Sequence, residues 1–323
     1  MDHFPRPRVV VSKCLGFDQV RYNGETIPDK VVKRLEPYVE FIPVCPEVEI
    51  GLGIPRDVIR IVKDQEVYQL VQPKTGKDLT ESMRTFSEQF MQALPAVDGF
   101  LLKNRSPTCG VNDAKVYADV ENSPVIEKTD GLFTQAVREY FGGVAIEEEG
   151  RLKNFTLREH FLTKLFTLAW FRQVKEEGTM KLLVAFHSKN KYLFMAYNQT
   201  LLTEMGRLVA NPPEMTKEEI MDAYEAKLQE MLDKPAGAGR HINVCQHIFG
   251  YFKNGLNSQE KQYFLHELDQ YEKEKIPLSA VLGILKAWAV RFEEKYLLQQ
   301  SYFEPYPIDL VEISDSGKGR AYS

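Results

Sequence analysis

The 323-residue sequence is poor in cysteine and has no long apolar run. Its four cysteines are too few for the disulfide framework of a small secreted domain. No stretch approaches the roughly 18 apolar residues that a membrane-spanning helix needs. The first residues, "MDHFPRPRVVV", lack a basic region followed by a long apolar core, which argues against a secretory signal. We therefore expect a cytoplasmic protein without a membrane partner, in which cysteines more often bind metals or act in catalysis.

The charge of the chain is unevenly distributed. A net charge of −5 argues weakly against a nucleic-acid partner, but residues 1–150 carry −6 and the remainder carries +1. Two segments, 181–203 and 235–259, contain basic residues and no acid. Such local patches matter more for binding a polyanion than the net charge does. The candidate phosphate contacts are Lys181, Lys189, Lys191, Arg240 and Lys253.

Aromatic residues and histidines lie among these basic residues: His187, Tyr192, His241 and Tyr251. They are candidates to stack on RNA bases or to hydrogen-bond to them. The alternative is that the lysines are simply solvated and that the aromatic residues belong to a helical core. The sequence leaves both interpretations open for each residue.

The first 150 residues alternate strand and helix patterns. Short apolar runs at 8–12, 40–44 and 98–102 predict strands. Apolar spacing predicts helices over 29–40, 77–94 and 131–143, the last of which ends in paired glycines. This alternation is typical of an α/β domain with a mostly parallel sheet.

The character of the sequence changes at about residue 150, and every later predicted element is a helix. Capping-box patterns open three of these helices, namely Thr156 with Glu159, Thr216 with Glu219, and Asn257 with Glu260. Pro277 begins a fourth. We predict an α/β domain over 1–150 and an all-α domain over 151–323. The last ten residues, "SDSGKGRAYS", are expected to be disordered.

Three of the four cysteines, Cys14, Cys45 and Cys109, follow predicted strands. Ligands bind at the carboxyl ends of parallel strands, so the three thiols could converge there. Clustered thiolates suit a soft metal centre, whereas buried core thiols are the alternative explanation of the same pattern. The fourth cysteine, Cys245, lies in a predicted helix, and we interpret it as a packing residue.

The spacing of the three cysteines bears on the kind of metal. The tight C-x₂₋₄-C spacing of structural zinc sites is absent, while iron–sulfur clusters accept widely separated thiolates. Three cysteines on a [4Fe–4S] cluster would leave one iron open. Glu47 and Glu49 follow Cys45 closely, and a carboxylate there could act as a general base. The alternative is a solvated acid, or one that pairs with Arg21 or Arg56.

Three motifs of the first part resemble the thiouracil desulfidase family. They are "VSKCLGFDQVRYNG", "PVCPEVEIGLGIPR" and "LKNRSPTCG", spread over about residues 1–150. The second part resembles a helical domain long catalogued without a function, through "AFHSKNKYLFMAYNQ" and "RHINVCQHIFGYFK". The combination is similar to the bacterial tRNA 4-thiouridine desulfidases.

This resemblance implies a cofactor, a reaction and a set of site residues. Cys14, Cys45 and Cys109 would ligate a [4Fe–4S] cluster whose open iron takes up the sulfur of the substrate. Glu47 and Ser106 match the catalytic positions of the family. Weaker carry-overs, expected to shape the pocket, are Arg21, Tyr22, Glu49 and Lys103. The implied reaction is the non-redox removal of sulfur from 4-thiouridine in tRNA, with release of uridine and hydrogen sulfide, while the helical domain helps to hold the tRNA.

Three other functions remain open at this level. The enzyme could act on free thiouracil, a thionucleoside or another small thiolated pyrimidine. The protein could instead be a non-enzymatic iron–sulfur sensor that binds nucleic acid, although a sensor has no need of a carboxylate and a serine beside an open iron. It could also be a sulfur carrier that delivers persulfide to a modification enzyme.

Overall fold

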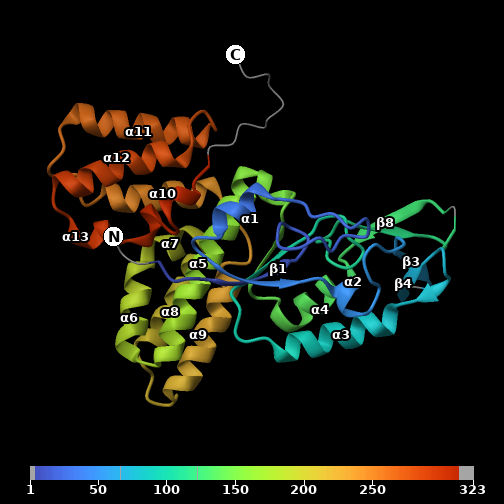
Figure 1. Cartoon of the computed structure of the whole chain (residues 1–323). Helices are drawn as coiled ribbons and strands as arrows, with labels where there is room; N and C mark the ends of the chain where they lie inside the picture. The colour runs from blue at the N-terminus through green and yellow to red at the C-terminus, as the bar shows by residue number, and fades with distance from the viewer. Residues whose placement is uncertain (1–3, 66, 122, 313–323) are drawn as a thin grey trace. The chain divides into compact units, whose positions relative to one another are not determined.

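The computed structural model describes residues 4–65, 67–121 and 123–312 (Figure 1). Contacts within the chain define two compact units. The first comprises residues up to Ala169 together with the segment from Asp309 onward, and the second comprises Trp170–Ile308. The tail that we expect to be disordered lies outside the described residues.

A four-stranded, fully parallel sheet forms the centre of the first unit. Its strands stand in the order β2 (Glu40–Val44), β1 (Arg8–Ser12), β6 (Gly99–Leu102) and β9 (Ala145–Glu148). The middle strands are buried except at Arg8, and Val9–Val11 and Phe100–Leu102 have no exposed surface. Burial on both faces explains why these strands are continuous apolar runs. The predicted α/β class with a mostly parallel sheet is confirmed.

Helices connect and cover this sheet (Figure 1). They are α1 (Lys30–Leu35), α2 (Pro46–Glu49), α3 (Thr80–Ala93) and α4 (Leu132–Phe141), followed by a 3₁₀ turn at Arg151–Lys153 and the start of α5 (Phe155–Glu177). Phe133 of α4 contacts the rings of Phe86 and Phe90 of α3. Phe141 of α4 contacts the ring of Phe100 in β6.

Two predicted helices are too long. Pro37 follows the end of α1, and α3 begins only at Thr80, whose N–H binds the Asp78 carboxylate at 2.8 Å.

The first unit also contains a second sheet, which we did not predict from the sequence. Its order is β5 (Lys77–Asp78), β4 (Val67–Gln72), β3 (Arg60–Asp64), β7 (Ala114–Tyr117) and β8 (Val125–Thr129). All neighbours are antiparallel except β3 and β7. Its strands mix apolar and charged residues, because much of this sheet is exposed: Val67 and Ile126 show about half of their surface. The alternation with polar residues is the weaker strand signal that we did not recognise.

The second unit is entirely helical, as predicted. After the remainder of α5 come α6 (Met180–Lys189), α7 (Lys191–Tyr197), α8 (Gln199–Val209), α9 (Lys217–Met231), α10 (Ala238–Phe249), α11 (Ser258–Glu272), α12 (Leu278–Arg291) and α13 (Lys295–Leu298), with 3₁₀ turns at Ser301–Phe303 and Ile308–Leu310. Aromatic rings contact one another continuously in its core: Trp170, Phe171, Phe186, Phe194 and Tyr224.

Two of the three predicted capping boxes are present and one is wrong. Thr216 with Glu219 and Asn257 with Glu260 cap α9 and α11 reciprocally. The third fails because α5 begins one residue before Thr156. Asn154 caps this helix instead, and its side-chain oxygen accepts from the N–H of Leu157 at 3.1 Å.

Candidate functional site

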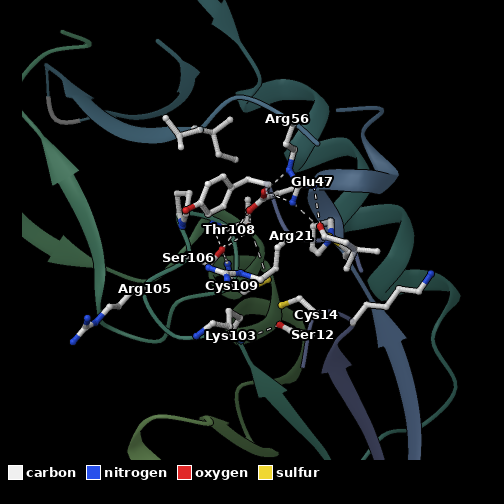
Figure 2. Close-up of a pocket in the computed structure, with 18 of the residues that line it drawn as sticks. Ser12, Cys14, Arg21, Glu47, Arg56, Lys103, Arg105, Ser106, Thr108 and Cys109 are labelled. Atoms are coloured by element: carbon white, nitrogen blue, oxygen red, sulfur yellow. Dashed lines mark hydrogen bonds and ion pairs between the residues drawn. The ribbon is translucent and has the colours of Figure 1, made fainter. Parts of the chain in front are cut away.

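A cavity of about 420 Å³ lies at the carboxyl ends of β1, β2 and β6 (Figure 2). The ends of β1 and β2 and the segments that follow the three strands supply most of its wall, and residues 20–22, Ile27 and residues 56–59 supply the rest. This position is where an open parallel sheet places its ligands. The volume is that of a small-ligand site.

The three cysteines that follow strands all line this cavity. Cys14 comes two residues after β1, Cys45 directly follows β2 at the start of α2, and Cys109 ends the loop after β6. Cys45 and Cys109 are 7% and 5% exposed. By contrast, Cys245 is fully buried in α10, with its sulfur 3.9 Å from the Tyr302 hydroxyl, and does not line the cavity. Its interpretation as a packing residue agrees with this burial.

The cavity thiols influence one another electrostatically. Burial, together with a smaller repulsion by Cys45, raises the pKa of Cys14 to about 12. Burial likewise raises the pKa of Cys109 to about 12. The hydrogen bonds of Ser12 and Thr108 have the opposite, smaller effect and lower this pKa. The thiols therefore hold their protons at neutral pH, and a metal that binds them as thiolates must displace those protons.

The three cysteines that line the cavity are the residues that could hold a metal group. Among the described residues, no group of three or more His, Cys, Asp or Glu side chains converges on a point that could hold one ion. A single zinc would need its sulfur ligands within about 4 Å of one another, given Zn–S bonds of about 2.3 Å. Each thiolate of an iron–sulfur cluster binds a different iron, so three cysteines spread around one cavity match that requirement.

Local hydrogen bonds shape the loop that carries Cys109. The Ser106 hydroxyl accepts from the N–H groups of Thr108 at 3.2 Å and Cys109 at 3.1 Å. The Thr108 carbonyl accepts from the N–H of Phe133, at the start of α4, at 3.0 Å. Gly131 permits this approach, because a Cβ there would lie 2.4 Å from the Thr108 carbonyl. We had not singled out Gly131, since its role depends on a contact between distant segments.

Glu47 is held by a buried ion pair with Arg56. The Nε and Nη2 groups of Arg56 donate to Glu47 Oε2 at 2.9 and 2.7 Å, and the two side chains are only 4% and 14% exposed. The remaining guanidinium nitrogen donates to the Val20 carbonyl at 2.9 Å. Arg56 is therefore fully engaged in orienting Glu47 within the cavity wall. Arg21, the other possible partner, pairs instead with Glu25 at 3.6 Å.

Thr108 connects the two predicted catalytic residues. Its hydroxyl donates to Glu47 Oε1 at 2.9 Å and lies 2.9 Å from the Ser106 hydroxyl, while the direct distance from Ser106 to Glu47 is 3.4 Å (Figure 2). Thr108 is fully buried. Thr108 was not among the predicted site residues, although it lies within "SPTCG". Together the three side chains form a hydrogen-bonded chain from Ser106 to Glu47.

The structure separates the weaker pocket candidates. Arg21 and Tyr22 line the cavity, and the Arg21 guanidinium lies 5.4 Å from the centre of the Tyr22 ring. Lys103 also lines it, but its ammonium group binds Glu149 and the Asn104 side chain. Glu49 is exposed and is not among the cavity-lining residues.

The candidate RNA contacts of the second unit differ in how available they are. Lys181, Arg240 and Lys253 are exposed, whereas Lys189 and Lys191 are half-buried. The Arg240 guanidinium already donates to the Tyr197 carbonyl. Each of three lysine ammonium groups lies over an aromatic ring: Lys189 over Trp170 at 5.7 Å, Lys191 over Tyr192 at 5.7 Å and Lys253 over Phe249 at 5.9 Å.

Both histidines near these basic residues have packing roles. His187 Nδ1 lies 3.0 Å from the Tyr224 hydroxyl, and His241 Nδ1 lies 2.9 Å from the Tyr302 hydroxyl. Burial lowers the pKa of each to about 4, so both are neutral at pH 7. Tyr192 is buried, at 3% exposure, which favours the core interpretation over stacking on RNA for this residue. Tyr251, at 45%, keeps an exposed ring.

Comparison with known proteins gives two domain matches. The profile of the 2-thiouracil desulfurase family matches residues 9–149. The profile of a domain described as "Protein of unknown function (DUF1722)" matches residues 191–307. The described part of the chain contains no helix long and apolar enough to cross a membrane.

Individual relatives match one part of the chain or the other. The uncharacterized protein YbgA of Escherichia coli (strain K12) is 30% identical over 158 residues, which cover 48% of this chain and 93% of that protein. The uncharacterized protein YbbK of Bacillus subtilis (strain 168) is 27% identical over 111 residues, 32% of this chain and 72% of that protein. A solved structure of the [4Fe–4S]-dependent thiouracil desulfidase TudS is 23% identical, with a TM-score of 0.35, over 46% of this chain and 93% of that one.

Proposed function

Because the chain belongs to the family of the Escherichia coli protein YbgA, and its residues 9–149 and 191–307 match the 2-thiouracil desulfurase and DUF1722 profiles, we propose that it is a tRNA 4-thiouridine desulfidase. The reaction replaces the C=S group of the base by C=O. Water supplies the oxygen, hydrogen sulfide leaves, and no electrons are transferred overall. Residues 1–150 carry the chemistry in this proposal, and residues 151–323 hold the tRNA.

One observation carries the proposal: three thiols and an oriented carboxylate line the same cavity. Cys14, Cys45 and Cys109 would hold a [4Fe–4S] cluster there. When bound, the cluster would supply thiophilic iron, whose affinity for sulfur would distinguish thiouracil from uracil.

Glu47 acts as the general base. Arg56 occupies Oε2 with two N–H groups, so the proton of the water that attacks the ring carbon goes to Oε1, which also accepts from the Thr108 hydroxyl. The short α2 fixes the backbone of Glu47 directly beside Cys45, so the carboxylate stays next to the sulfur-binding side of the cavity. Arg56 has no role in proton transfer and serves to position the carboxylate.

Ser106 and Thr108 give the proton a return path. Thr108 donates to Glu47 Oε1 and contacts Ser106, so a proton accepted by Glu47 can move to the ring side of the cavity as the C–S bond breaks. Ser106 is also fixed by two backbone N–H groups, which hold its hydroxyl in place.

Replacing Thr108 by valine tests this path. The shape of the side chain is nearly kept while its hydroxyl is lost, so we expect kcat to fall by about ten- to a hundredfold. The free energy of unfolding should fall by about 1–2 kcal/mol, because Glu47 loses a buried donor. Thr108→Ser keeps the hydroxyl and should keep most of the activity. Equal sulfide-release rates in Thr108→Val and the native protein would exclude Thr108 from the path.

The tRNA part of the proposal is supported by the exposed cations Lys181, Arg240 and Lys253 and by the exposed ring of Tyr251 in the second unit. Basic residues that contact phosphates release counterions when RNA binds. Affinity for tRNA should therefore fall steeply as salt is raised.

A second candidate substrate is the free base. The matched family is described as a 2-thiouracil desulfurase, and the cavity volume suits a single small ligand. In that case the helical unit would serve another purpose, such as dimerisation.

One paired assay separates the two substrates. The protein is reconstituted anaerobically with iron and sulfide and given either tRNA bearing 4-thiouridine or free 2-thiouracil, and the sulfide released from each is quantified. We expect sulfide from the tRNA, and none when Cys109→Ala replaces the native protein. Sulfide from the free base alone would remove tRNA as the substrate. Sulfide from neither would favour a non-enzymatic iron–sulfur protein.

A further inference from the structure

The guanidinium of Arg56 has five N–H groups, and the structure gives it five hydrogen-bond contacts. Nε and Nη2 each donate to Glu47, at 2.9 and 2.7 Å. Nη1 donates to the carbonyls of Val20 and Gly53, at 2.9 and 3.2 Å. Nη2 also reaches the sulfur of Cys45, at 4.0 Å. The other four contacts orient the carboxylate, whereas the contact with Cys45 has no part in that task.

The contact with Arg56 suits Cys45 best when its sulfur is a metal ligand. A neutral thiol is a weak hydrogen-bond acceptor, whereas a thiolate that binds metal carries negative charge. Hydrogen bonds between charged partners are roughly twice as strong as neutral ones. The Arg56 side chain is almost completely buried, so salt screens its charge little. A buried cationic donor beside Cys45 therefore stabilises the metal-bound form most.

Thr108 makes a similar but weaker arrangement at another cysteine of the cavity. Its hydroxyl binds Glu47 Oε1 at 2.9 Å and lies 3.6 Å from the sulfur of Cys109. This hydroxyl has a single proton, which Glu47 accepts, whereas Nη2 of Arg56 has two N–H groups and can serve both of its acceptors at once. Of the two side chains, Arg56 alone also brings a charge to a cavity sulfur.

Glu47 and Arg56 act on Cys45 with opposite sign. Burial is the main cause that raises the pKa of the Cys45 thiol, while Glu47 contributes in the same direction and Arg56 in the opposite direction. A guanidinium favours negative charge at this sulfur, and a carboxylate disfavours it. The reduction potential of an iron–sulfur cluster depends on nearby charge and on hydrogen bonds to its sulfurs. The two residues should therefore move such a potential in opposite directions.

We infer that Arg56 is a positioning residue for the metal site as well as for the base, and that its contact with the Cys45 sulfur retains a bound [4Fe–4S] cluster and raises the reduction potential of that cluster. This inference rests on the proposed function, because it takes Cys45 as a cluster ligand. It adds a role for Arg56 that is separate from holding Glu47.

The test measures the cluster without substrate. The full-length protein is reconstituted anaerobically with iron and sulfide, and two quantities are recorded. The first is the rate at which a chelator removes iron, followed by absorbance. The second is the reduction potential, from a reductive titration followed by electron paramagnetic resonance.

Arg56→Met removes the donor and its charge while keeping the length of the side chain. Iron loss should become at least about tenfold faster, as for other partners of metal ligands. The potential should become more negative by about tenfold in the equilibrium constant for reduction, which is about 59 mV for one electron. Arg56→Lys keeps the charge with fewer donors, so its potential should stay close to native while iron loss lies between the two.

Glu47→Gln should shift the potential in the opposite direction, because Arg56 then acts on Cys45 without a neighbouring negative charge. The double variant Arg56→Met with Glu47→Gln leaves no unpaired charge buried, so it tests the inference even if Arg56→Met does not fold. Compared with Glu47→Gln alone, it should lose iron faster and have a more negative potential. Arg291→Gln is the matched control, because Arg291 pairs with Glu260 at 2.6 Å outside the cavity wall, and it should behave as the native protein does.

The outcomes separate this inference from the proposed function. Native iron retention in the double variant, or shifts of the same sign in Arg56→Met and Glu47→Gln, would overturn the role of Arg56. If the shifts occur as expected while tRNA yields no sulfide, this role stands and the tRNA reaction fails. If tRNA yields sulfide while iron loss and potential stay native in the Arg56 variants, the reverse holds. A native protein that takes up no cluster would overturn both.

Discussion

Cys109→Ala is expected to abolish both the cluster absorbance of the reconstituted protein and the release of sulfide. Cys109 is nearly buried at the end of the loop after β6, and no other cysteine is available in the cavity wall to replace it besides Cys14 and Cys45. Loss of an outer-shell partner already costs a metal site about ten- to a hundredfold in affinity or activity. Loss of a direct ligand should lower sulfide release by at least about a hundredfold.

Cys245→Ala is the matched control for this experiment. Cys245 is equally buried but lies in α10, away from the cavity-lining set. Its replacement should leave iron content, absorbance and sulfide release near native values. The assignment of the three ligands fails if Cys109→Ala retains a full cluster, or if Cys245→Ala loses it.

Glu47→Gln is expected to lower kcat by about a hundred- to ten-thousandfold while the cluster absorbance stays intact. The amide has nearly the same shape but cannot take the proton of a water, and general-base catalysis contributes about that factor. The protein should also be less stable by about 1–3 kcal/mol, because the buried Arg56 loses its charged acceptor. Anaerobic sulfide kinetics and a thermal melt measure the two effects.

The cluster absorbance of Glu47→Gln shows whether Glu47 acts in catalysis or holds the metal site together. An intact cluster with full activity in Glu47→Gln would show that another group activates water. Loss of the cluster in this variant would make Glu47 a structural residue of the metal site. Arg84→Gln, an exposed change on α3, provides the reference for nonspecific effects on reconstitution.

The parts of the site that follow from local sequence were predicted. β1, β2 and β6 are apolar runs, and Cys14 and Cys45 stand within two residues of their ends, so the shared sheet edge follows from the parallel topology. Their position on one cavity wall agrees with this expectation. Their role as cluster ligands stays a prediction, as do the roles of Glu47 and Ser106.

The supporting residues depend on contacts that local sequence does not encode. The sequence left Arg21 and Arg56 as two possible partners for Glu47. In the structure Arg56 pairs with Glu47, whereas Arg21 pairs with Glu25. Gly131 matters only because α4 begins against the Thr108 carbonyl, 23 positions away. Such pairings are fixed by tertiary packing, so a single sequence cannot rank them.

The open alternatives in the second unit depend on tertiary packing in the same way. RNA contact and core packing were both possible for His187, His241 and Tyr192, and the structure shows each of them hydrogen-bonded to a tyrosine hydroxyl of the helical unit. An amphipathic helix turns its apolar face toward the core and its polar face toward solvent. Residues at the boundary between the two faces can be buried or exposed, and helical spacing does not decide which. The exposed Lys181 and Lys253 remain candidates for contact with tRNA.

The open iron is tested most directly by the Mössbauer spectrum of the anaerobically reconstituted protein, recorded before and after addition of a thiolated uridine. Three cysteine ligands and one open iron predict a [4Fe–4S] spectrum in which one iron differs from the other three, and in which only that iron changes when the substrate is added. A spectrum with four equivalent irons that the substrate leaves unchanged would contradict the central claim that this cavity binds the sulfur of the substrate at an open iron.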